Sequence, residues 1–394
     1  MSGSGSHGAL IAGCGQAPYT RHPPASTTTP AVLAQAAWSA LRSVGMDADA
    51  LDGLAVSSFS LEPDHAVDLA WRMGLHLRWL MQDTNGGASG VNMVQHAVRA
   101  VEAGDARAVL VVAGDHLPRE RFQELVDNYN SATRDHLAPL PFGGPNSLFA
   151  MLTQRHARAN GLGRADYGSL VVAQRAWAGG NPGAVYREPL SLDDYLTAPI
   201  VADPLCIYDC VPVVTGADAL IVCADSASDQ DSPVAVRAAK LGFNDDDQQG
   251  DGLRTGLAAV ADGLWRTAGA GPGDMDITMV YDDYPAMALI QLSDLGYVPD
   301  GDLHALIQEQ VASRQLALNT SGGQLSAGQA GAAGGLHGIV EAVRQLRGEA
   351  GSRQIANARL ALAAGYGMVC YRYGACAGAL VLERISRTLR PARS

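Results

Sequence analysis

Lysine is almost absent from this sequence. Of its 28 lysine and arginine residues, Lys240 is the only lysine. Enzymes that form a Schiff base with a carbonyl substrate need a lysine amine, so any such mechanism would have to use Lys240. This residue closes a strand-like run over residues 233–240, and we expect it at the end of a strand, outside a catalytic pocket. The sequence therefore argues against Schiff-base chemistry.

Closely spaced cysteine pairs of the kind that bind zinc are also missing. No two of the six cysteines form a Cys-x-x-Cys motif, and Cys206 and Cys210, four residues apart, have no second pair of ligands beside them. We therefore expect no metal site in this chain. The thiols are expected to be reduced and to lie in the core, as in a cytoplasmic protein. The remaining cysteines are Cys14, Cys223, Cys370 and Cys376.

Two further absences narrow the class of protein. No apolar run reaches the roughly 18 residues of a membrane-spanning helix, and no signal-peptide pattern opens the chain. A formal net charge of −12 argues against binding to nucleic acid or to an anionic membrane surface. With 394 residues, of which 47% are hydrophobic, the chain can bury more than one folding unit. We expect a globular protein that binds neither nucleic acid nor membrane.

One structural unit occurs twice in the sequence. Residues 87–115 contain a glycine-rich loop, a helical pattern of apolar residues, a turn and an apolar strand, and residues 331–365 repeat this order. Residues 51–56 and 275–280 form a second pair of similar strand-like segments. Strands that alternate with helices in this way predict a duplicated α/β fold with mostly parallel sheets.

The two halves are expected to meet near a polar, turn-rich run at residues 244–251. This predicts an N-terminal half over residues 1–245 and a C-terminal half over residues 246–394. Residues 116–200 have little strand signal and hold several prolines, glycines and tyrosines. We expect them to form a helical insertion that caps the first half.

The loop Asn-Gly-Gly-Ala-Ser-Gly at residues 85–90 marks a candidate site. It opens the first helical pattern, and the N-terminus of a helix leaves backbone N–H groups without partners inside the helix. Such groups can stabilise an oxyanion that develops during a reaction. We therefore expect this loop to bind the reacting part of a substrate.

Four blocks of the sequence together resemble the thiolase superfamily. Residues 85–90 resemble its nucleophile loop. Residues 181–195, followed by residues 203–210, resemble a segment of sterol-carrier-protein-type thiolases, also called lipid-transfer proteins. Residues 319–335 are similar to their glycine-rich Asn-Pro-Ser-Gly-Gly loop, and residues 360–367 to their last catalytic strand. Because the blocks span nearly the whole chain in the family's order, the resemblance implies the thiolase-like, duplicated, five-layered αβαβα architecture.

The catalytic residues of that family do not carry over. By this resemblance, Gly87 occupies the position of the nucleophilic cysteine, and Gln329 that of a histidine. Ala364 lies near the position of a second cysteine or histidine, and Tyr281 replaces an asparagine or histidine. Glycine, alanine and an amide offer neither a nucleophile nor a base, so the family's cysteinyl thioester has no residue to form on.

The sequence also resembles a subgroup of lipid-transfer-protein thiolases that act as aldolases in bacterial steroid side-chain degradation. Residues 319–329 and 365–368 carry this resemblance. It implies retro-aldol cleavage of a β-hydroxyacyl-CoA without a covalent intermediate, from a 17-hydroxy steroid C22 acyl-CoA to a 17-ketosteroid and propionyl-CoA. Two alternatives stay open: a catalytically degenerate subunit that binds CoA esters, and thiolytic cleavage of an aromatic β-ketoacyl-CoA with a partner subunit.

The candidate site residues are identified by their positions relative to the family's motifs and by the chemistry of their side chains. Tyr281 and Tyr366 are the predicted proton-transfer groups, because each lies where the family places its acid or base and a phenol can transfer a proton. Asp282 is predicted to orient its neighbours. Three other tyrosines are expected only to pack: Tyr284, Tyr371 and Tyr373. The predicted substrate-binding residues are Gly87, Ala88, Ser321, Gly322, Gly323 and Gln329.

The resemblance also implies the partners of this chain. It implies a homodimer that pairs through the edge of the first-half sheet, and a separate CoA-binding partner that carries a zinc ribbon and an OB-fold. Zinc is expected only in that partner chain. No cofactor is expected here besides the CoA thioester that serves as substrate.

Overall fold

The computed structural model describes residues 8–140, 143–225, 232–245, 249–298, 300–370 and 373–385, except for the side chains of residues 370 and 373. Within these residues, nine strands form one sheet in the order β3-β2-β4-β7-β1-β8-β11-β10-β9. The strands are β1 (Ala9–Thr20), β2 (Gly53–Ser57), β3 (Trp79–Asp83), β4 (Ala108–Asp115), β7 (Thr215–Ala224), β8 (Val234–Phe243), β9 (Ile277–Met279), β10 (Leu360–Cys370) and β11 (Tyr373–Arg384).

The sheet repeats one pattern of strand pairing. In the first half, β2 is parallel to β4, and β4 and β7 continue antiparallel toward β1. In the second half, β9 is parallel to β10, and β10 and β11 continue antiparallel toward β8. The two patterns meet where β1 pairs with β8. The predicted α/β class and the duplication are therefore seen in the topology, although the sheets are mixed. The boundary at residue 245 stays a prediction.

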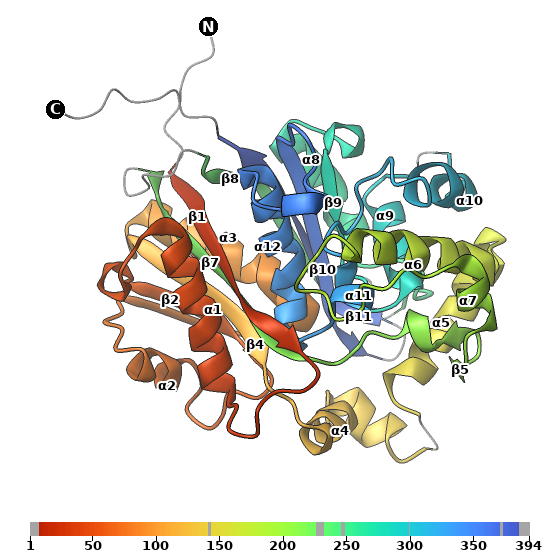
Figure 1. Ribbon diagram of the computed structural model, residues 1–394, viewed down its shortest axis with the longest axis horizontal. Coiled ribbons are helices and arrows are strands. Elements are labelled where there is room, and N and C mark those ends of the chain that lie inside the picture. The colour runs from red at the N-terminus through yellow and green to blue at the C-terminus, as the bar shows by residue number, and fades with distance from the viewer. Residues whose placement is uncertain are drawn as a thin grey trace, which may run out of the picture.

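Helices cover the sheet on both sides and fill the space between its halves. Helices α3 (Ser89–Ala103) and α12 (Gly334–Arg347) lie side by side in the middle of the molecule (Figure 1) and share one apolar core with strands of both halves. Helices α1 (Thr29–Val44) and α2 (His65–Arg72) cover the outer face of the first half. Helices α8 and α9 cover the second half, so the layers follow the expected order. Their bounds are Leu257–Ala268 and Pro285–Asp294.

The predicted insertion at residues 116–200 is helical, but it is mainly its first part that contacts the first half. There Arg121 pairs with Glu62 at 3.6 Å, and the ring of Tyr129 meets that of Phe59 edge to face. Phe149 of α5 and Leu170 of α6 share a core with Leu289 of α9, on the second half, and Figure 1 shows α6 beside α11, with α7 on the outer side of α6. For the rest of the insertion's helices the expectation was wrong, because an amphipathic pattern shows that a helix buries one face, not what covers that face. The insertion comprises α4 (Arg119–Asp127), α5 (Pro145–Asn160), α6 (Arg164–Ala178) and α7 (Leu192–Thr197).

Short elements complete the described part of the chain. They connect the insertion to the sheet and build the loops of the second half. They include β5 (Ile200–Ala202), β6 (Leu205–Cys206), α10 (Leu303–Ala305) and α11 (Gly323–Ala327).

Lys240 lies inside a strand and not at its end. β8 continues to Phe243, and Lys240 pairs with Ala379 of β11 in the interior of the sheet. The sequence prediction placed the strand end too early, because the run Leu241-Gly-Phe243 was not counted as strand. The side chain of Lys240 is half-buried and lies beside α8, near Gly263.

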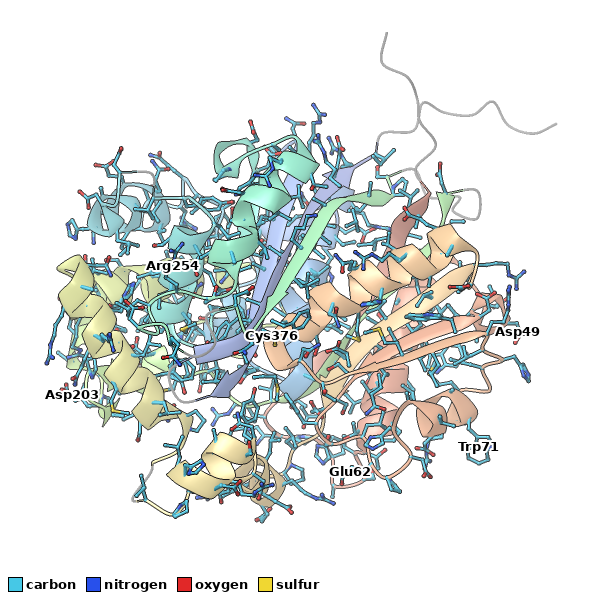
Figure 2. All side chains as sticks on the ribbon, turned by 180° about the vertical axis from the view of Figure 1, so that it is seen from behind. Asp49, Glu62, Trp71, Asp203, Arg254 and Cys376 are labelled. Carbon is cyan, nitrogen blue, oxygen red and sulfur yellow. The ribbon has the colours of Figure 1, made fainter. Side chains whose placement is uncertain are left out.

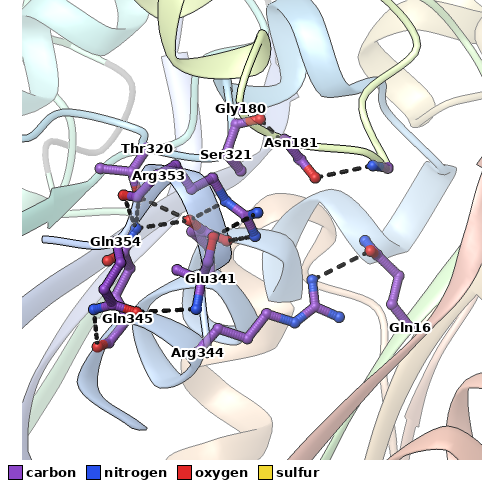
Figure 3. Close-up of polar contacts among 12 residues, drawn as sticks. Gln16, Gly180, Asn181, Thr320, Ser321, Glu341, Arg344, Gln345, Arg353 and Gln354 are labelled. Atoms are coloured by element: carbon purple, nitrogen blue, oxygen red, sulfur yellow. Dashed lines mark hydrogen bonds and ion pairs between the residues drawn. The ribbon is translucent and has the colours of Figure 1, made fainter. Parts of the chain in front are cut away.

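A buried ion pair holds the loop that precedes α11. Arg353 donates to both carboxylate oxygens of Glu341, at 2.9 and 2.7 Å, and the Thr320 hydroxyl donates to the same carboxylate at 2.9 Å (Figure 3). Asn181 donates its side-chain amide to the carbonyl of Ser321 at 2.9 Å. Bidentate, charge-assisted bonds of this kind fix geometry, so residues 319–321 are held rigidly behind the site described next.

Candidate active site

Two equivalent glycine-rich turns meet at the centre of the molecule. The turn Gly86–Ala88 leads into α3, and the turn Gly331–Ala333 leads into α12. A β-carbon built on Gly90 would lie 1.8 Å from the carbonyl oxygen of Gly335, a separation that only a glycine permits. The small residues therefore allow the N-termini of the two central helices to touch, which brings both turns to one place.

Gly87 has no space for a side chain. A β-carbon on Gly87 would lie 2.1 Å from the carbonyl oxygen of Tyr366 and 2.5 Å from Cε2 of Tyr281. On β10, a β-carbon on Gly365 or Gly367 would likewise strike the backbone of the 85–87 turn, at 2.2 and 2.1 Å. The tyrosine ring and strand β10 thus fill the position that the resemblance assigns to a nucleophilic cysteine.

A cavity of about 280 Å³ opens beside this position. Gly86, Gly87 and Gly331 form one end of it, together with the side chains of Tyr281 and Gln329. Its opposite wall is apolar and comes mainly from the helical insertion, through Leu117, Phe122, Leu125, Val126, Leu148 and Phe149. The site therefore has a polar end that contains backbone N–H groups and an apolar chamber that can hold an acyl chain or a ring system.

Tyr281 is a proton donor at the polar end. The side-chain amide of Gln329 donates to its hydroxyl oxygen at 2.8 Å, which leaves the phenolic proton free to point toward the cavity. Burial and the nearby charge of Asp283 raise the pKa of Tyr281 well above 10. Tyr281 is therefore protonated near neutral pH and can act as an acid in the cleavage direction.

Tyr366 lies behind Asp283. The Tyr281 and Tyr366 rings meet edge to face, with centroids 5.4 Å apart, and the Tyr366 hydroxyl donates to both oxygens of Asp283, at 2.6 and 2.7 Å. Tyr366 is only 1% exposed, whereas Asp283 is half-buried and lines the cavity. Burial raises the pKa of Asp283 to about 7, and the bond from Tyr366 opposes this rise.

Sequence reasoning did not single out Asp283. One signal could have found it: in an extended segment, alternate side chains point to the same side, so Asp283 faces the same way as Tyr281 while Asp282 faces the other way. Asp282 is indeed turned away from the cavity. It accepts the backbone N–H groups of Gln324 and Leu325, at 2.8 and 3.4 Å, and burial raises its pKa to about 7.

The structure places three predicted substrate-binding residues away from the main cavity. The Ser321 hydroxyl lies 2.8 Å from Nε2 of His337, whose Nδ1 lies 3.6 Å from Asp218. This Ser-His-Asp array, which residue spacing does not reveal, is almost fully buried. Gly322 packs on Ala178 of α6, and Gly323 packs on the Asp282 carboxylate. Ala88 is buried too, so contact of these residues with a substrate stays a prediction.

The other tyrosines divide into two groups. Tyr284 stacks on Phe149 with a centroid distance of 4.1 Å and donates its hydroxyl to Asn146 at 2.6 Å, which fits the expected packing role, although it also lines the cavity. Tyr371 and the Tyr373 side chain lie outside what the structure describes.

Cys210 is a thiol that lines the cavity. Burial, with the charge of Asp209 added, raises its pKa to about 12, so this thiol does not ionise near neutral pH and is a poor nucleophile. Cys210 and the other cysteines with described side chains form no disulfide.

Metal-binding and membrane-spanning features are both missing from the described residues. No group of three or more histidine, cysteine, aspartate or glutamate side chains in them is arranged to hold a metal ion. Within the same part of the chain, no helix has the length and apolar character needed to cross a membrane.

Comparisons with known proteins place the chain among thiolase-like and aldolase relatives. A family model described as "Thiolase C-terminal domain-like" matches residues 244–382. The 17-hydroxy-3-oxo-4-pregnene-20-carboxyl-CoA lyase of Mycobacterium tuberculosis is 31% identical over 362 residues, which cover 86% of this chain and 92% of that protein. The steroid side-chain-cleaving aldolase of Thermomonospora curvata is 26% identical over 361 residues, which cover 86% of this chain and 90% of that protein.

A solved structure of an "Ltp2-ChsH2(DUF35) aldolase" has the same fold. It superposes with a TM-score of 0.83 over 98% of this chain and 99% of that chain, at 24% identity. The expected thiolase-like architecture is thereby confirmed, with the cavity at the junction of its two halves.

Proposed function

We propose that this chain, which belongs to the thiolase superfamily and to its steroid side-chain-cleaving aldolases, cleaves a β-hydroxyacyl-CoA by a retro-aldol reaction. The enzyme is a carbon–carbon lyase. The substrate that we propose is a 17-hydroxy steroid C22 acyl-CoA, and the products are a 17-ketosteroid and propionyl-CoA. The apolar chamber formed by the helical insertion suits the ring system of such a substrate.

One observation carries the mechanism. The side-chain position of Gly87 is filled by the Tyr281 ring and the Tyr366 carbonyl, so the reaction proceeds without an acyl-enzyme at that position. Retro-aldol cleavage needs only a base for the β-hydroxyl proton, a stabilised enolate and an acid for the α-carbon. In this chain, backbone N–H groups of the turns at Gly86–Ala88 and Gly331–Ala333 would face the enolate oxygen. Each such donor contributes about 2.7–4 kcal/mol to transition-state stabilisation.

A product assay tests this function. The protein is incubated with β-hydroxyacyl-CoA and β-ketoacyl-CoA substrates, alone and with a zinc-ribbon/OB-fold partner, and the products are identified by mass spectrometry. We expect a ketone and a shorter acyl-CoA from the β-hydroxyacyl-CoA, and no cleavage of the β-ketoacyl-CoA. Cleavage of only the β-ketoacyl-CoA, in the presence of free CoA, would favour a thiolase. Tight binding of acyl-CoA without cleavage would favour a degenerate subunit.

A second assay isolates the enolate half-reaction. We expect the enzyme to exchange the α-protons of propionyl-CoA for deuterium in D2O, because the reverse reaction begins by forming the same enolate. Deuterium incorporation without added ketone would support the retro-aldol assignment. Absence of exchange, in a preparation that binds propionyl-CoA, would count against it.

Lys240 is expected to take no part in catalysis. Lys240→Arg should leave the cleavage rate within severalfold of wild type, because Lys240 lies within β8 beside α8 and is not among the residues that line the cavity. Steady-state kinetics check this expectation. Borohydride reduction in the presence of substrate should leave no adduct on Lys240, and trapping of substrate there would disprove it.

We also propose a partner chain that carries the zinc ribbon and OB-fold. The support is the similar solved structure, an aldolase named for Ltp2 together with ChsH2(DUF35). In this proposal, zinc belongs to the partner, and CoA is bound by both chains together. The cysteines with described side chains form no disulfide, which fits a reducing, cytoplasmic location.

A homodimer is proposed through strand β3. Among the described strands, this one is the outermost of the first half and pairs on one side only, with β2, and Leu80 on it is 42% exposed. On the neighbouring helix α2, Val67 and Trp71 are 62% and 78% exposed, and Figure 2 shows Trp71 at the periphery of the molecule. An apolar edge strand of this kind is a template for pairing with a second chain.

Leu80→Glu is expected to dissociate this dimer, because the two-fold axis would bring two new carboxylates close together. We expect the dimer dissociation constant to rise by about 10²-fold, or roughly 2.7 kcal/mol, as measured by light scattering and analytical ultracentrifugation. Ile200→Glu, which changes an exposed apolar residue on β5, is the matched control and should leave the dimer intact. A wild-type protein that is monomeric at high concentration would refute the proposal.

A further inference from the structure

The Asp283 carboxyl group stands between the cavity and Tyr366. Asp283 lines the cavity, whereas Tyr366 is 1% exposed and is not among the lining residues. A substrate hydroxyl in the cavity can therefore reach the carboxylate of Asp283 directly. To reach the phenol of Tyr366, it would have to pass the carboxylate.

The direction of the hydrogen bonds supports the same conclusion. A phenol that lies 2.6 and 2.7 Å from the two oxygens of a carboxylate donates its proton to that carboxylate. Burial and the charge of Asp283 also raise the pKa of Tyr366 well above 10. Tyr366 therefore keeps its proton near neutral pH, directs it at Asp283, and cannot accept another from a substrate.

The surroundings leave Asp283 as the one proton acceptor in the lining. Among the described lining residues, it is the sole carboxylate, and there is no arginine, lysine or histidine. The titratable groups around it are Tyr281, Asp282 and Tyr284 of its own segment and Tyr366 of β10, with Tyr129 and Cys210 elsewhere in the cavity wall. Burial raises the pKa of Asp283 to about 7, and a base with a pKa close to the working pH is the most effective kind.

We propose that Asp283 is the general base of this enzyme, and that Tyr366 is a positioning residue that holds the Asp283 carboxylate toward the cavity. This inference rests on the proposed retro-aldol function. The carboxylate takes the β-hydroxyl proton, the C–O bond becomes a carbonyl, and the Cα–Cβ bond breaks. Its electron pair passes into the thioester as an enolate, whose α-carbon takes a proton from Tyr281. The proton on Asp283 then returns to the Tyr281 phenolate through solvent, which restores both groups.

The test is the pH dependence of kcat/KM in two variants. In the wild type, kcat/KM should fall as the pH drops below about 7, because Asp283 becomes protonated. Asp283→Asn should lose about 10²–10⁴-fold at every pH. Tyr366→Phe removes a hydrogen bond that lowers the pKa of Asp283. The acid limb, which is the fall of kcat/KM at low pH, should therefore move to a pH about 1–2 units higher. At high pH, where Asp283 is ionised in this variant too, most of the rate should return.

Two matched variants outside the cavity serve as controls. Asp294→Asn removes another buried carboxylate. Burial raises the pKa of Asp294 to about 6, and its carboxylate accepts hydrogen bonds from the backbone N–H and the hydroxyl of Thr255, just before α8. Tyr297→Phe removes another buried phenol, bonded to Thr278 at 2.8 Å. Both should leave the position of the acid limb unchanged. If Tyr366→Phe lost as much rate as Asp283→Asn at every pH, with no shift, Tyr366 itself would transfer the proton and our assignment would be wrong.

A readout without substrate separates this inference from the proposed function. Infrared difference spectra over a pH titration should contain, beside the band of Asp282, a second carboxyl band with a midpoint near pH 7 that is missing in Asp283→Asn and shifted to higher pH in Tyr366→Phe. If the wild type showed this band but cleaved no β-hydroxyacyl-CoA, the proposed function would fail while the coupling of Tyr366 to Asp283 would stand. If no such band were lost in Asp283→Asn, the inference would fail whatever the activity.

Discussion

Tyr281→Phe is expected to lower the rate of β-hydroxyacyl-CoA cleavage by about 10²–10⁴-fold, the usual effect of removing a general acid. The hydroxyl of Tyr281 lies at the polar end of the cavity, where Gln329 donates to its oxygen and leaves its proton available. Phenylalanine keeps the ring that packs against Gly87 and Tyr366. The fold should therefore survive, and the loss should appear in kcat and not in the melting temperature.

Deuterium exchange into propionyl-CoA gives this prediction its sharpest readout. A general acid for the α-carbon in one direction is the base for that carbon in reverse, so exchange should fall together with cleavage in Tyr281→Phe. Tyr297→Phe, which removes a hydroxyl bonded to Thr278 outside the cavity, should change neither. A Tyr281→Phe enzyme with near-wild-type cleavage and exchange would return Tyr281 to a packing role.

The regular parts of this fold could be predicted because their signals are local. The apolar periodicities at residues 91–101 and 108–113 correspond to α3 and β4, and their repeats correspond to α12 and β10. The placement of most of the helical insertion was missed, since a helix pattern does not specify which distant surface the helix covers. Lys240 was misplaced within its strand for a related reason, because strand ends carry weak signals when the flanking residues are also compatible with a sheet.

The site was predicted in part. The sequence brought Gly87, Tyr281 and Gln329 together, and the structure places all three on one cavity. Sequence reasoning chose Asp282 over Asp283, although the alternation of side chains along an extended segment puts Asp283 on the side of Tyr281, in the cavity, and turns Asp282 toward α11. It could not show that Ser321 bonds to His337, since that contact depends on α12 packing across residues 319–321. Pairs that are distant in sequence become visible only when the sheet and helices are assembled.

Gly87→Cys is expected to restore no thiolase activity and to abolish cleavage. The new β-carbon would lie 2.1 Å from the Tyr366 carbonyl oxygen and 2.5 Å from the Tyr281 ring, so the ring must move out of its catalytic position. Overpacking of a buried site costs about 1–3 kcal/mol, which should lower the melting temperature. The bases that thiolases use would still be missing, because Gln329 and Ala364 offer no imidazole or thiol.

Gly87→Ala is the control that separates crowding from chemistry. It adds the same β-carbon without a thiol, so the loss of cleavage and of thermal stability should match that of Gly87→Cys. Intact-mass spectra during turnover should show no acyl adduct on the wild-type protein, including at Cys210, whose pKa of about 12 keeps it a thiol. A stable acyl adduct on the cysteine introduced at position 87, accompanied by thiolysis of a β-ketoacyl-CoA, would mean that the superfamily's covalent route is still open. In that case the filled space at Gly87 could not be the reason that this enzyme works without a nucleophile.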